Sequence, residues 1–303
     1  MVAIRTAGLT KRYGDLVAVD DLTFEVGEGE VYALLGHNGA GKTTTVEILE
    51  GYRRRTSGEV TVLGTDPGSA GREFRDRIGV VLQTSGVEHE LTVAEAVDVY
   101  GSCYSRRRSV GEVVELVGLT PQLGQRIRTL SGGQRRRLDL AMGIVGHPDL
   151  LFLDEPTTGF DPAARRNAWE LVRSFGSGGS TVLLTTHYLD EAEHLADRVG
   201  VIARGRLVAE GTPAELIGRA GSTTVRFDLP AGLSPADIAA LLPAGALAGN
   251  HHVEFTTSTP TADVNALTGW ALERGVELDG LSVSRPTLED VFLSIAGAEE
   301  PVT

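Results

Sequence analysis

A glycine-rich loop between an apolar strand and a helix is the feature that most constrains the fold of this chain. The apolar run Val31 to Leu35 is typical of a buried strand, and residues Lys42 to Glu50 are predicted to form a helix that ends before Gly51. The residues between them, Gly36-His37-Asn38-Gly39-Ala40-Gly41-Lys42-Thr43, fit the phosphate-loop pattern completely. Strand, loop and helix in this order predict an α/β fold with a nucleoside triphosphate bound at the loop.

Each residue type in the loop has a role in holding phosphate. Glycines permit unusual backbone angles, so that N–H groups point inward at the phosphates, and the helix N-terminus adds a favourable dipole. Lys42 is expected to reach the β- and γ-phosphates, and Thr43 to ligate Mg²⁺. ATP and Mg²⁺ are therefore the expected cofactors. The candidate nucleotide-binding residues of this region are Gly36, His37, Asn38, Gly39, Ala40, Gly41, Lys42, Thr43 and Thr44.

A pair of acidic residues follows a second apolar strand. Asp154 ends the strand predicted at Leu150 to Leu153, and Glu155 comes next. A carboxylate at a strand end can hold Mg²⁺ through water, and the following one can activate the attacking water. Acidic residues often end buried strands, so the pair gains its weight from lying downstream of the phosphate loop.

The stretch Leu130-Ser131-Gly132-Gly133-Gln134 lies between the phosphate loop and the acidic pair. It is a second glycine-rich element, and we interpret it as a complementary half-site. One chain cannot easily fold this element onto its own phosphate loop. The sequence therefore predicts two chains arranged head to tail, with ATP between them.

Strands that alternate with helices predict a largely parallel sheet in the first part of the chain. Helical spacing from Leu91 to about Gly124 and an amphipathic helix after the glycine-rich element indicate an inserted helical subdomain at about residues 85–145. A linker is predicted at Arg219 to Ser222. The predicted domains are thus 1–218 and a small α+β accessory domain, 223–303, with helices at Ala236 to Leu242 and Val264 to Arg274.

Composition excludes several functions. The chain of 303 residues has a formal net charge of −13, so bulk attraction to nucleic acid or anionic lipid is not expected. Its single cysteine, Cys103, excludes an intrachain disulfide. No apolar stretch approaches the ~18 residues needed to span a bilayer, and no signal peptide is evident. We therefore expect a soluble, cytoplasmic protein whose membrane role requires a partner.

Taken together, these motifs resemble the nucleotide-binding subunit of an ATP-binding-cassette transporter, over Ile4 to about Leu216. The resemblance implies a phosphate-loop NTPase cassette with a mixed sheet core. Near the end of the chain, Ser284-Arg-Pro-Thr-Leu-Glu-Asp-Val-Phe-Leu293 is similar to the drug-export branch of the daunorubicin-resistance type. This branch uses a separate membrane permease subunit and exports antibiotics, other drugs and lipids.

The resemblance assigns three roles within one subunit. It implies that Tyr13 stacks on adenine, that Gln83 senses Mg²⁺ during catalysis and couples to the membrane partner, and that His187 contacts the γ-phosphate and orients the water. Tyr13 could instead pack against its own domain, and Gln83 could be an ordinary strand-end amide. His187 also has metal-like spacing with Glu191 and His194, but a further zinc ligand is missing.

Three more residues are implied to act between subunits. Ser131 and Gly133 should contact the γ-phosphate held by the other copy, and Asp161 should cross the dimer interface. The implied function is hydrolysis of ATP, with Glu155 as the base, to power export through the membrane subunit. The protein would then lie at the inner face of the cell membrane and could confer antibiotic resistance.

Two other classes of protein share this type of ATPase head. Repair and chromosome-associated ATPases of the family insert a long coiled coil between the phosphate loop and the glycine-rich element, and this chain has no sustained heptads there. Translation-associated members usually carry two cassettes in one chain. A non-transport ATPase acting on nucleic acid or ribosomes is the alternative function.

Arginine occurs in three short runs, Arg53 to Arg55, Arg106 to Arg108 and Arg135 to Arg137. We interpret all three as solvated faces. Because the last run follows the glycine-rich element, it could also contribute to the electrostatics of phosphate binding or of the interface.

Overall fold

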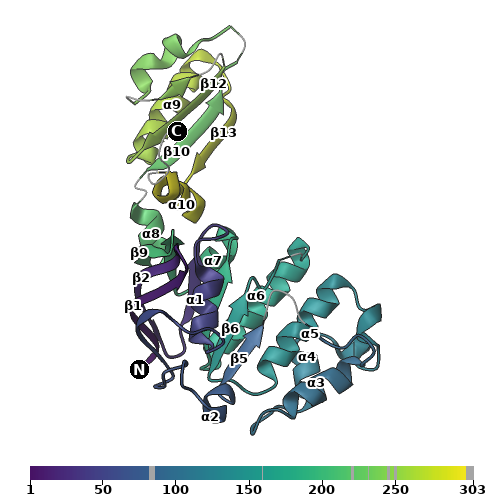
Figure 1. Cartoon of the computed structure of the whole chain (residues 1–303). Coiled ribbons are helices and arrows are strands. Elements are labelled where there is room, and N and C mark those ends of the chain that lie inside the picture. Colours follow the sequence, from purple (N-terminus) through teal and green to yellow (C-terminus); the bar gives the residue numbers. More distant parts are fainter. Residues whose placement is uncertain are drawn as a thin grey trace. The chain divides into compact units, whose positions relative to one another are not determined.

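The chain divides into two units, Met1–Pro213 and Ala214–Thr303 (Figure 1). The computed structural model describes residues 1–81, 86–158, 160–219, 222–230, 232–243, 246–248 and 251–297. The division falls at the start of α8 (Pro213–Arg219), before the linker predicted at Arg219 to Ser222. Within the described residues, no helix combines the length and apolar character needed to cross a bilayer.

A six-stranded sheet forms the centre of the first unit. Its strand order is β5-β6-β7-β3-β8-β9, and only β9 runs antiparallel to its neighbour. The strands are β5 (Ile78–Val81), β6 (Leu150–Asp154), β7 (Thr181–Thr186), β3 (Val31–Leu35), β8 (Arg198–Ala203) and β9 (Arg206–Gly211). Every residue of β3 and β7 is buried, as expected for central strands covered on both faces. The parallel sheet predicted from the alternation of strands and helices is confirmed.

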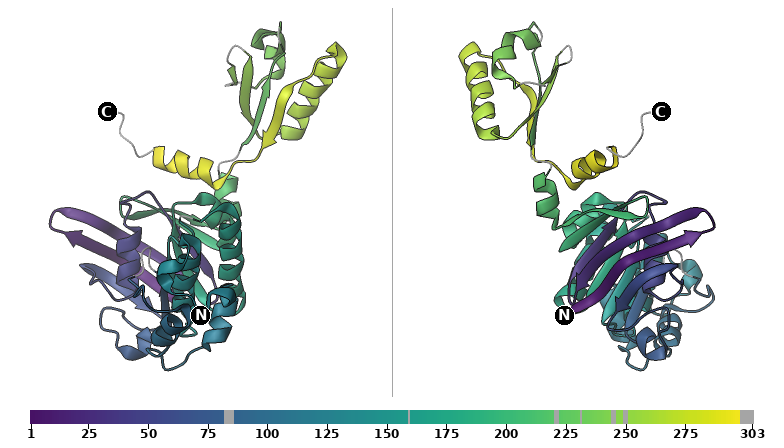
Figure 2. Two further views of the ribbon diagram at one scale, coloured as in Figure 1. Left: turned by 90° about the vertical axis from the view of Figure 1, so that its right-hand side faces the viewer. Right: turned by 60° about the vertical axis from the view of Figure 1, so that its left-hand side comes forward.

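A second, antiparallel sheet was not predicted. It consists of β2 (Leu16–Gly27), β1 (Val2–Tyr13) and β4 (Ser57–Val62), with β1 in the middle. In Figure 2 the purple β1 and β2 form a long hairpin. Apolar side chains from this sheet share one core with both the central sheet and α1 (Lys42–Leu49). The mixed-sheet class is therefore correct, because antiparallel strands and a parallel sheet share one core.

Helices group into a separate part of the first unit. Here α3 (Val93–Gly101), α4 (Val110–Leu116) and α5 (Gly132–Ile144) pack together, joined by the short 3-10 turns Thr120–Gln122 and Ile127–Thr129 (Figure 1). Capping boxes at Thr92 and Ser131 fix the starts of α3 and α5. The remaining helices of the unit are α2 (Arg72–Arg75), α6 (Pro162–Ser177) and α7 (Leu189–Leu195).

The second unit is an α+β fold, as predicted. Its antiparallel sheet has the order β11-β12-β10-β13, formed by β11 (Leu247–Ala248), β12 (His252–Thr257), β10 (Thr223–Asp228) and β13 (Asp279–Ser284). Alternate residues of β10 and β12 pack with Leu267 and Ala271 of α9 (Pro260–Arg274). The helix predicted at Ala236 to Leu242 is instead a 3-10 helix, Pro235–Leu241, and α10 (Leu288–Gly297) follows β13.

Candidate nucleotide-binding and hydrolysis site

Two glycines of the phosphate loop lie too close to other backbone for any larger residue. A Cβ atom on Gly36 would lie 2.5 Å from the carbonyl oxygen of Ile202, and one on Gly41 would lie 2.4 Å from that of Ala18. Gly41 also has φ 105°, in the left-handed region, where it caps α1. The loop therefore runs directly from β3 into α1 along a path that requires glycine at these two positions.

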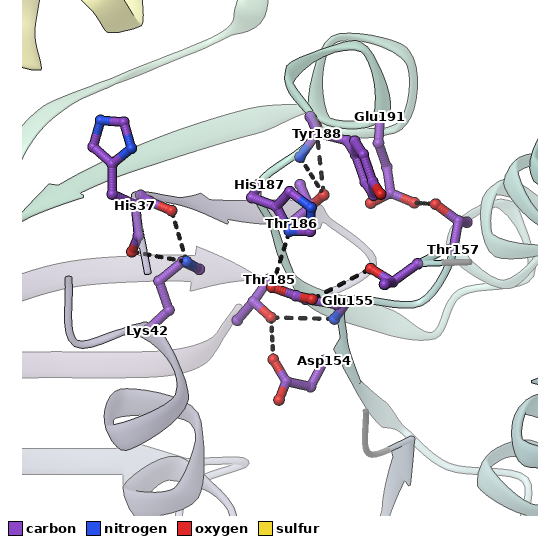
Figure 3. A network of polar contacts seen from close by, with 12 residues as sticks. His37, Lys42, Asp154, Glu155, Thr157, Thr185, Thr186, His187, Tyr188 and Glu191 are labelled. Carbon is purple, nitrogen blue, oxygen red and sulfur yellow. Dashed lines mark hydrogen bonds and ion pairs between the residues drawn. The ribbon is translucent and has the colours of Figure 1, made fainter. Parts of the chain in front are cut away.

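Lys42 is folded back onto the loop that precedes it. Its Nζ donates hydrogen bonds to the carbonyl oxygens of Gly36 and His37, at 2.6 and 3.2 Å (Figure 3). Burial lowers the pKa of the Lys42 amine, while the charges of Glu155 and Asp154 act in the opposite direction. Because both carboxylates act on the pKa of Lys42, the phosphate loop and the acidic pair interact electrostatically.

The register of three parallel strands explains how these groups meet. Leu35, the last residue before the loop, pairs with Thr186 across β3 and β7, and Asp154 pairs with Thr185 across β6 and β7. Parallel strands end at the same edge of a sheet, so the segments that follow them converge. This edge therefore carries the phosphate loop, the acidic pair and the Thr-Thr-His segment.

Glu155 has a backbone conformation that non-glycine residues rarely adopt. Its φ is 49°, a left-handed value that costs about 1–3 kcal/mol and persists only where the surrounding structure holds it. The Glu155 N–H donates to the carbonyl and hydroxyl oxygens of Thr185, at 3.0 and 3.3 Å. The Thr185 hydroxyl in turn donates to the Asp154 carboxylate. Thr185, which sequence reasoning did not single out, thus ties both acidic residues to β7.

The Glu155 carboxylate points at His187. Nδ1 of His187 lies 3.0 Å from Oε1 of Glu155 (Figure 3). The Thr158 hydroxyl donates to Oε2 of Glu155 at 3.3 Å. The side chain of Glu155 is 12% exposed and that of His187 is 38% exposed. A mostly buried carboxylate oriented by a histidine can accept a proton from a water molecule placed between it and the loop.

The donor atoms at this edge suit magnesium. Mg²⁺ prefers oxygen ligands such as carboxylates and hydroxyls. Thr43 lies exposed in the first turn of α1, which follows β3, and Asp154 ends β6, which is separated from β3 by β7. These two residues fit the expected ion, whereas Gln83, the third predicted ligand, lies outside the described residues.

Tyr13 lies at the end of β1 and is 39% exposed. Lys11 Nζ and the Arg53 guanidinium lie 4.9 and 5.3 Å from the centre of its ring. The ring is therefore available at the surface, with cations beside it, and is not packed into the core. A flat aromatic ring in such a position can stack on a base.

Of the residues predicted to act across an interface, Ser131 and Asp161 are exposed and Gly133 is half-buried. Ser131 caps α5, its hydroxyl accepting the Gln134 N–H at 3.2 Å. Apart from the adjoining backbone of α5, no atom of the described residues lies within 4 Å of the position that a Cβ on Gly133 would take. Asp161 is exposed and accepts the Ala164 N–H at 2.9 Å at the start of α6. In Figure 1, α5 is grouped with α3 and α4, away from α1 and its loop.

The metal-like spacing of His187, Glu191 and His194 does not form a site. Glu191 is fully buried and accepts hydrogen bonds from Thr157 and Trp169, at 2.8 and 3.1 Å. His194 packs on the ring of Trp169, with ring centres 4.8 Å apart. Among the residues that the structure describes, no group of three or more His, Cys, Asp or Glu side chains could hold a metal ion.

The interpretation of Arg135 to Arg137 as a solvated face is wrong for its middle residue. Arg136 is only 7% exposed. Its guanidinium donates to backbone carbonyl oxygens around the acidic pair, including that of Glu155 at 2.8 Å. A run of arginines carries no signal that one member is buried, because the burial depends on a contact between distant segments.

A hollow of about 520 Å³ lies between the strand β5 and the helices α3 and α5. Aromatic side chains line it, among them Tyr52, Phe74 and Tyr104, together with the buried carboxyl group of Glu50. Burial raises the pKa of Glu50 to about 8, and the charges of Asp154 and Glu47 add to this effect. At neutral pH the hollow thus contains a protonated glutamic acid.

Known proteins share both the sequence and this arrangement. The family described as "ABC transporter" matches residues 19–158, and "ABC transporter domain-containing protein-like, C-terminal domain" matches residues 223–287. The daunorubicin resistance ATP-binding protein DrrA3 of Streptomyces coeruleorubidus is 38% identical, over 99% of this chain and 98% of that protein. The chain belongs to the ATP-binding-cassette (ABC) transporter family. It is an ATPase of the daunorubicin-resistance type, as its motifs indicated.

Two further ABC relatives align along nearly the whole chain. The daunorubicin/doxorubicin resistance ATP-binding protein DrrA of Streptomyces peucetius is 40% identical, over 97% of this chain and 92% of that protein. The Nod factor export ATP-binding protein I of Rhizobium meliloti is 41% identical, over 98% of this chain and 89% of that protein. A solved ATP-binding subunit of an ABC transporter superposes with a TM-score of 0.65 at 26% identity, over 72% of this chain and 92% of that one.

Glu50 gives the ABC subunit a testable pH dependence. Its carboxyl group has an ordinary pKa of 4.5 when unfolded and about 8 when folded, so the folded state holds its proton more tightly. The contribution of the Glu50 carboxyl group to stability is therefore fully present below about pH 4.5, and it is lost as the pH rises towards 8. Glu50→Gln should raise the melting temperature at pH 9 by about 3 °C or more, and by less at pH 5.

Differential scanning calorimetry without nucleotide measures this effect. Glu115→Gln, the same change at an exposed position on α4, should leave the melting temperature unchanged at both pH values. If the rise in melting temperature caused by Glu50→Gln is no larger at pH 9 than at pH 5, the Glu50 carboxyl group ionises normally.

Proposed function

We propose that this ABC ATPase works as a head-to-tail dimer and powers export of a drug, antibiotic or lipid-like compound through a separate membrane subunit. The relatives named for daunorubicin and doxorubicin resistance and for Nod factor export support this class of cargo. In this role the protein is peripheral on the inner face of the cell membrane. The alternative, action on nucleic acid or ribosomes, gains no support from these relatives or from the net charge of −13.

The contact between Glu155 and His187 is the observation that carries the proposed hydrolysis. With its carboxylate 3.0 Å from His187, Glu155 is placed to take a proton from water. The water oxygen then bonds to the γ-phosphorus, and the bond from that phosphorus to the bridging oxygen breaks to release ADP. Lys42, beside the same carboxylates, neutralises charge on the β- and γ-phosphates, and His187 orients the water and contacts the γ-phosphate.

Other residues hold the substrate. Tyr13 stacks on adenine, and the loop N–H groups from Gly36 to Thr44 surround the phosphates. Thr43 and Asp154 would supply oxygen ligands for Mg²⁺. Gln83, which lies outside the described residues, would be a third ligand. When bound, the ion neutralises phosphate charge and orients the terminal phosphate.

The dimer completes each site. The exposed N-terminus of α5 presents Ser131 and Gly133, and the helix dipole there favours an anion. We assign its partner as the γ-phosphate bound by the other copy, with Asp161 crossing the interface. ATP thus favours the closed dimer because only there does it gain the second set of contacts. Phosphate release then reopens it.

The membrane subunit contacts the aromatic hollow beside β5. Val81 and Gly86, which flank the segment containing Gln83, both line this hollow. Its aromatic side chains offer apolar area together with polar edges, a composition typical of protein interfaces. Opening and closing of the dimer would move the partner through this contact.

Replacement of Glu155 tests its role as the base. Glu155→Gln keeps the shape of the side chain but cannot accept the proton, so turnover should fall about 10²–10⁴-fold while ATP still binds. Phosphate release and equilibrium nucleotide binding are the measurements. Glu170→Gln, the same change at an exposed position of α6, is the control and should keep full turnover. Near-normal hydrolysis by Glu155→Gln would remove Glu155 from this role.

The same variant tests the dimer. Because Glu155→Gln retains ATP, it should elute as a dimer in size-exclusion chromatography with ATP and Mg²⁺, and as a monomer with ADP. Adding Ser131→Arg should prevent the dimer without preventing nucleotide binding, since the bulky side chain blocks the exposed tip. A Glu155→Gln protein that stays monomeric with bound ATP would contradict the head-to-tail arrangement.

Affinity capture from detergent-solubilised membranes of the protein's own cells tests the partner. A multi-span membrane protein should co-purify with the chain. Tyr52→Asp, which places a charge in the aromatic hollow, should reduce its recovery at least about tenfold, a loss typical of an interface hot spot. Leu116→Asp, on an exposed position of α4 outside the hollow, should not. Recovery of ribosomes or nucleic acid in place of a membrane protein would favour the alternative function.

A further inference from the structure

Arg136 connects the helix of the glycine-rich element to the turn that carries Glu155. The helix α5 begins after Ser131, and Arg136 lies in its second turn. The side chain of Arg136 is only 8% exposed. A buried guanidinium requires hydrogen-bond partners, because an unpaired buried charge is strongly destabilising. The identity of those partners therefore shows what the residue holds.

The described partners include three consecutive backbone carbonyl groups. Nη2 of Arg136 donates to the carbonyl oxygens of Asp154 and Glu155, each at 2.8 Å, and Nε donates to that of Pro156 at 3.1 Å. Asp139, one helical turn further along α5, lies 3.7 Å from Nη1. Only arginine has a planar fork of donors that can reach three such oxygens together, since a lysine ammonium is a compact point charge.

These three carbonyls belong to the segment whose backbone is strained at Glu155. On one side of this segment the Glu155 N–H is held by Thr185 of β7. On the other side the carbonyl oxygens are held by Arg136 of α5. The N–H and carbonyl groups of Glu155 are thus held by two different elements, β7 and α5. Because its backbone is fixed from both sides, the Glu155 side chain is directed towards His187.

We propose that Arg136 is a positioning residue for ATP hydrolysis, which holds the backbone of residues 154–156 so that the Glu155 carboxylate stays beside His187. The inference rests on the proposed role of Glu155 as the base. Arg136 acts through the backbone that it bonds. Its loss should therefore lower kcat and leave the affinity for ATP nearly unchanged.

Arg136→Lys tests the proposal because it keeps the charge beside Asp139 but removes the fork of donors. We expect kcat to fall about 10–100-fold, the effect of a misplacement of about 1 Å, with KM for ATP within about twofold. Arg135→Lys is the matched control on the same helix. Among the contacts described, Arg135 donates only to the carbonyl oxygen of Leu130, at 3.3 Å. The Arg135→Lys enzyme should therefore keep the kcat of the unmodified protein.

A double-mutant cycle separates positioning from a general structural effect. If Arg136 acts through the Glu155 carboxylate, Arg136→Lys should have no further effect on the residual rate of Glu155→Gln. A structural defect would lower the rate in both backgrounds and would weaken ATP binding. If Glu155 is not the base, the single variant Glu155→Gln retains turnover, and this result is distinct from any effect of Arg136→Lys.

Two outcomes would overturn the proposal. One is a kcat of Arg136→Lys within about twofold of the Arg135→Lys control, since a rate change this small would exclude a positioning effect. The other is an equal loss of rate in the Glu155→Gln background. If Arg136→Lys does not yield folded protein, Arg136→Gln, which keeps two N–H donors, is measured in the same assays with the same criteria.

Discussion

The backbone hydrogen bonds that set β6, β7 and β3 in register are the constraint on which the rest of the site depends. They place Asp154 opposite Thr185, and Leu35 opposite Thr186. Three segments that are distant in sequence therefore end together at one edge of the sheet. All three strands are buried on both faces, and a shift of one residue would exchange the side chains that pack on the two faces, so the close packing specifies the register.

Around this edge, polar groups replace the apolar packing that fills the rest of the unit. The Thr185 side chain is fully buried and Arg136 nearly so, and both direct their hydrogen bonds at residues 154–156. Such buried networks are stable only when their members are satisfied, and they then fix one conformation. The strained backbone of Glu155 is the feature that they maintain. Rigidity at this turn suits the role proposed for Glu155, in which its carboxylate has to face a substrate atom accurately.

Local patterns in the sequence predicted the phosphate loop, the strand at 150–154 and the accessory α+β unit, because each depends on spacing between neighbouring residues. Other features depend on contacts between distant segments. The strands β1 and β2 are half exposed, and their pairing contains several register shifts. Leu22, Phe24 and Val26 do alternate with exposed residues, but no local pattern indicates which strands pair. Arg136 is buried only because α5 packs beside residues 154–156. At Pro235–Leu241, apolar spacing could not distinguish a 3-10 helix from an α-helix.

The helix α5 carries its exposed cap, Ser131, and its buried arginine on one continuous hydrogen-bonded rod. Five residues of α-helix span only about 7.5 Å, too short for the rod to bend appreciably between them. A force applied to the cap therefore reaches the carbonyl groups beside Glu155 as a displacement of the whole helix. In the proposed dimer, contact by the second copy at the tip of α5 would therefore be transmitted to the turn that carries Glu155 in the same chain, and each nucleotide site would respond to the occupancy of the other.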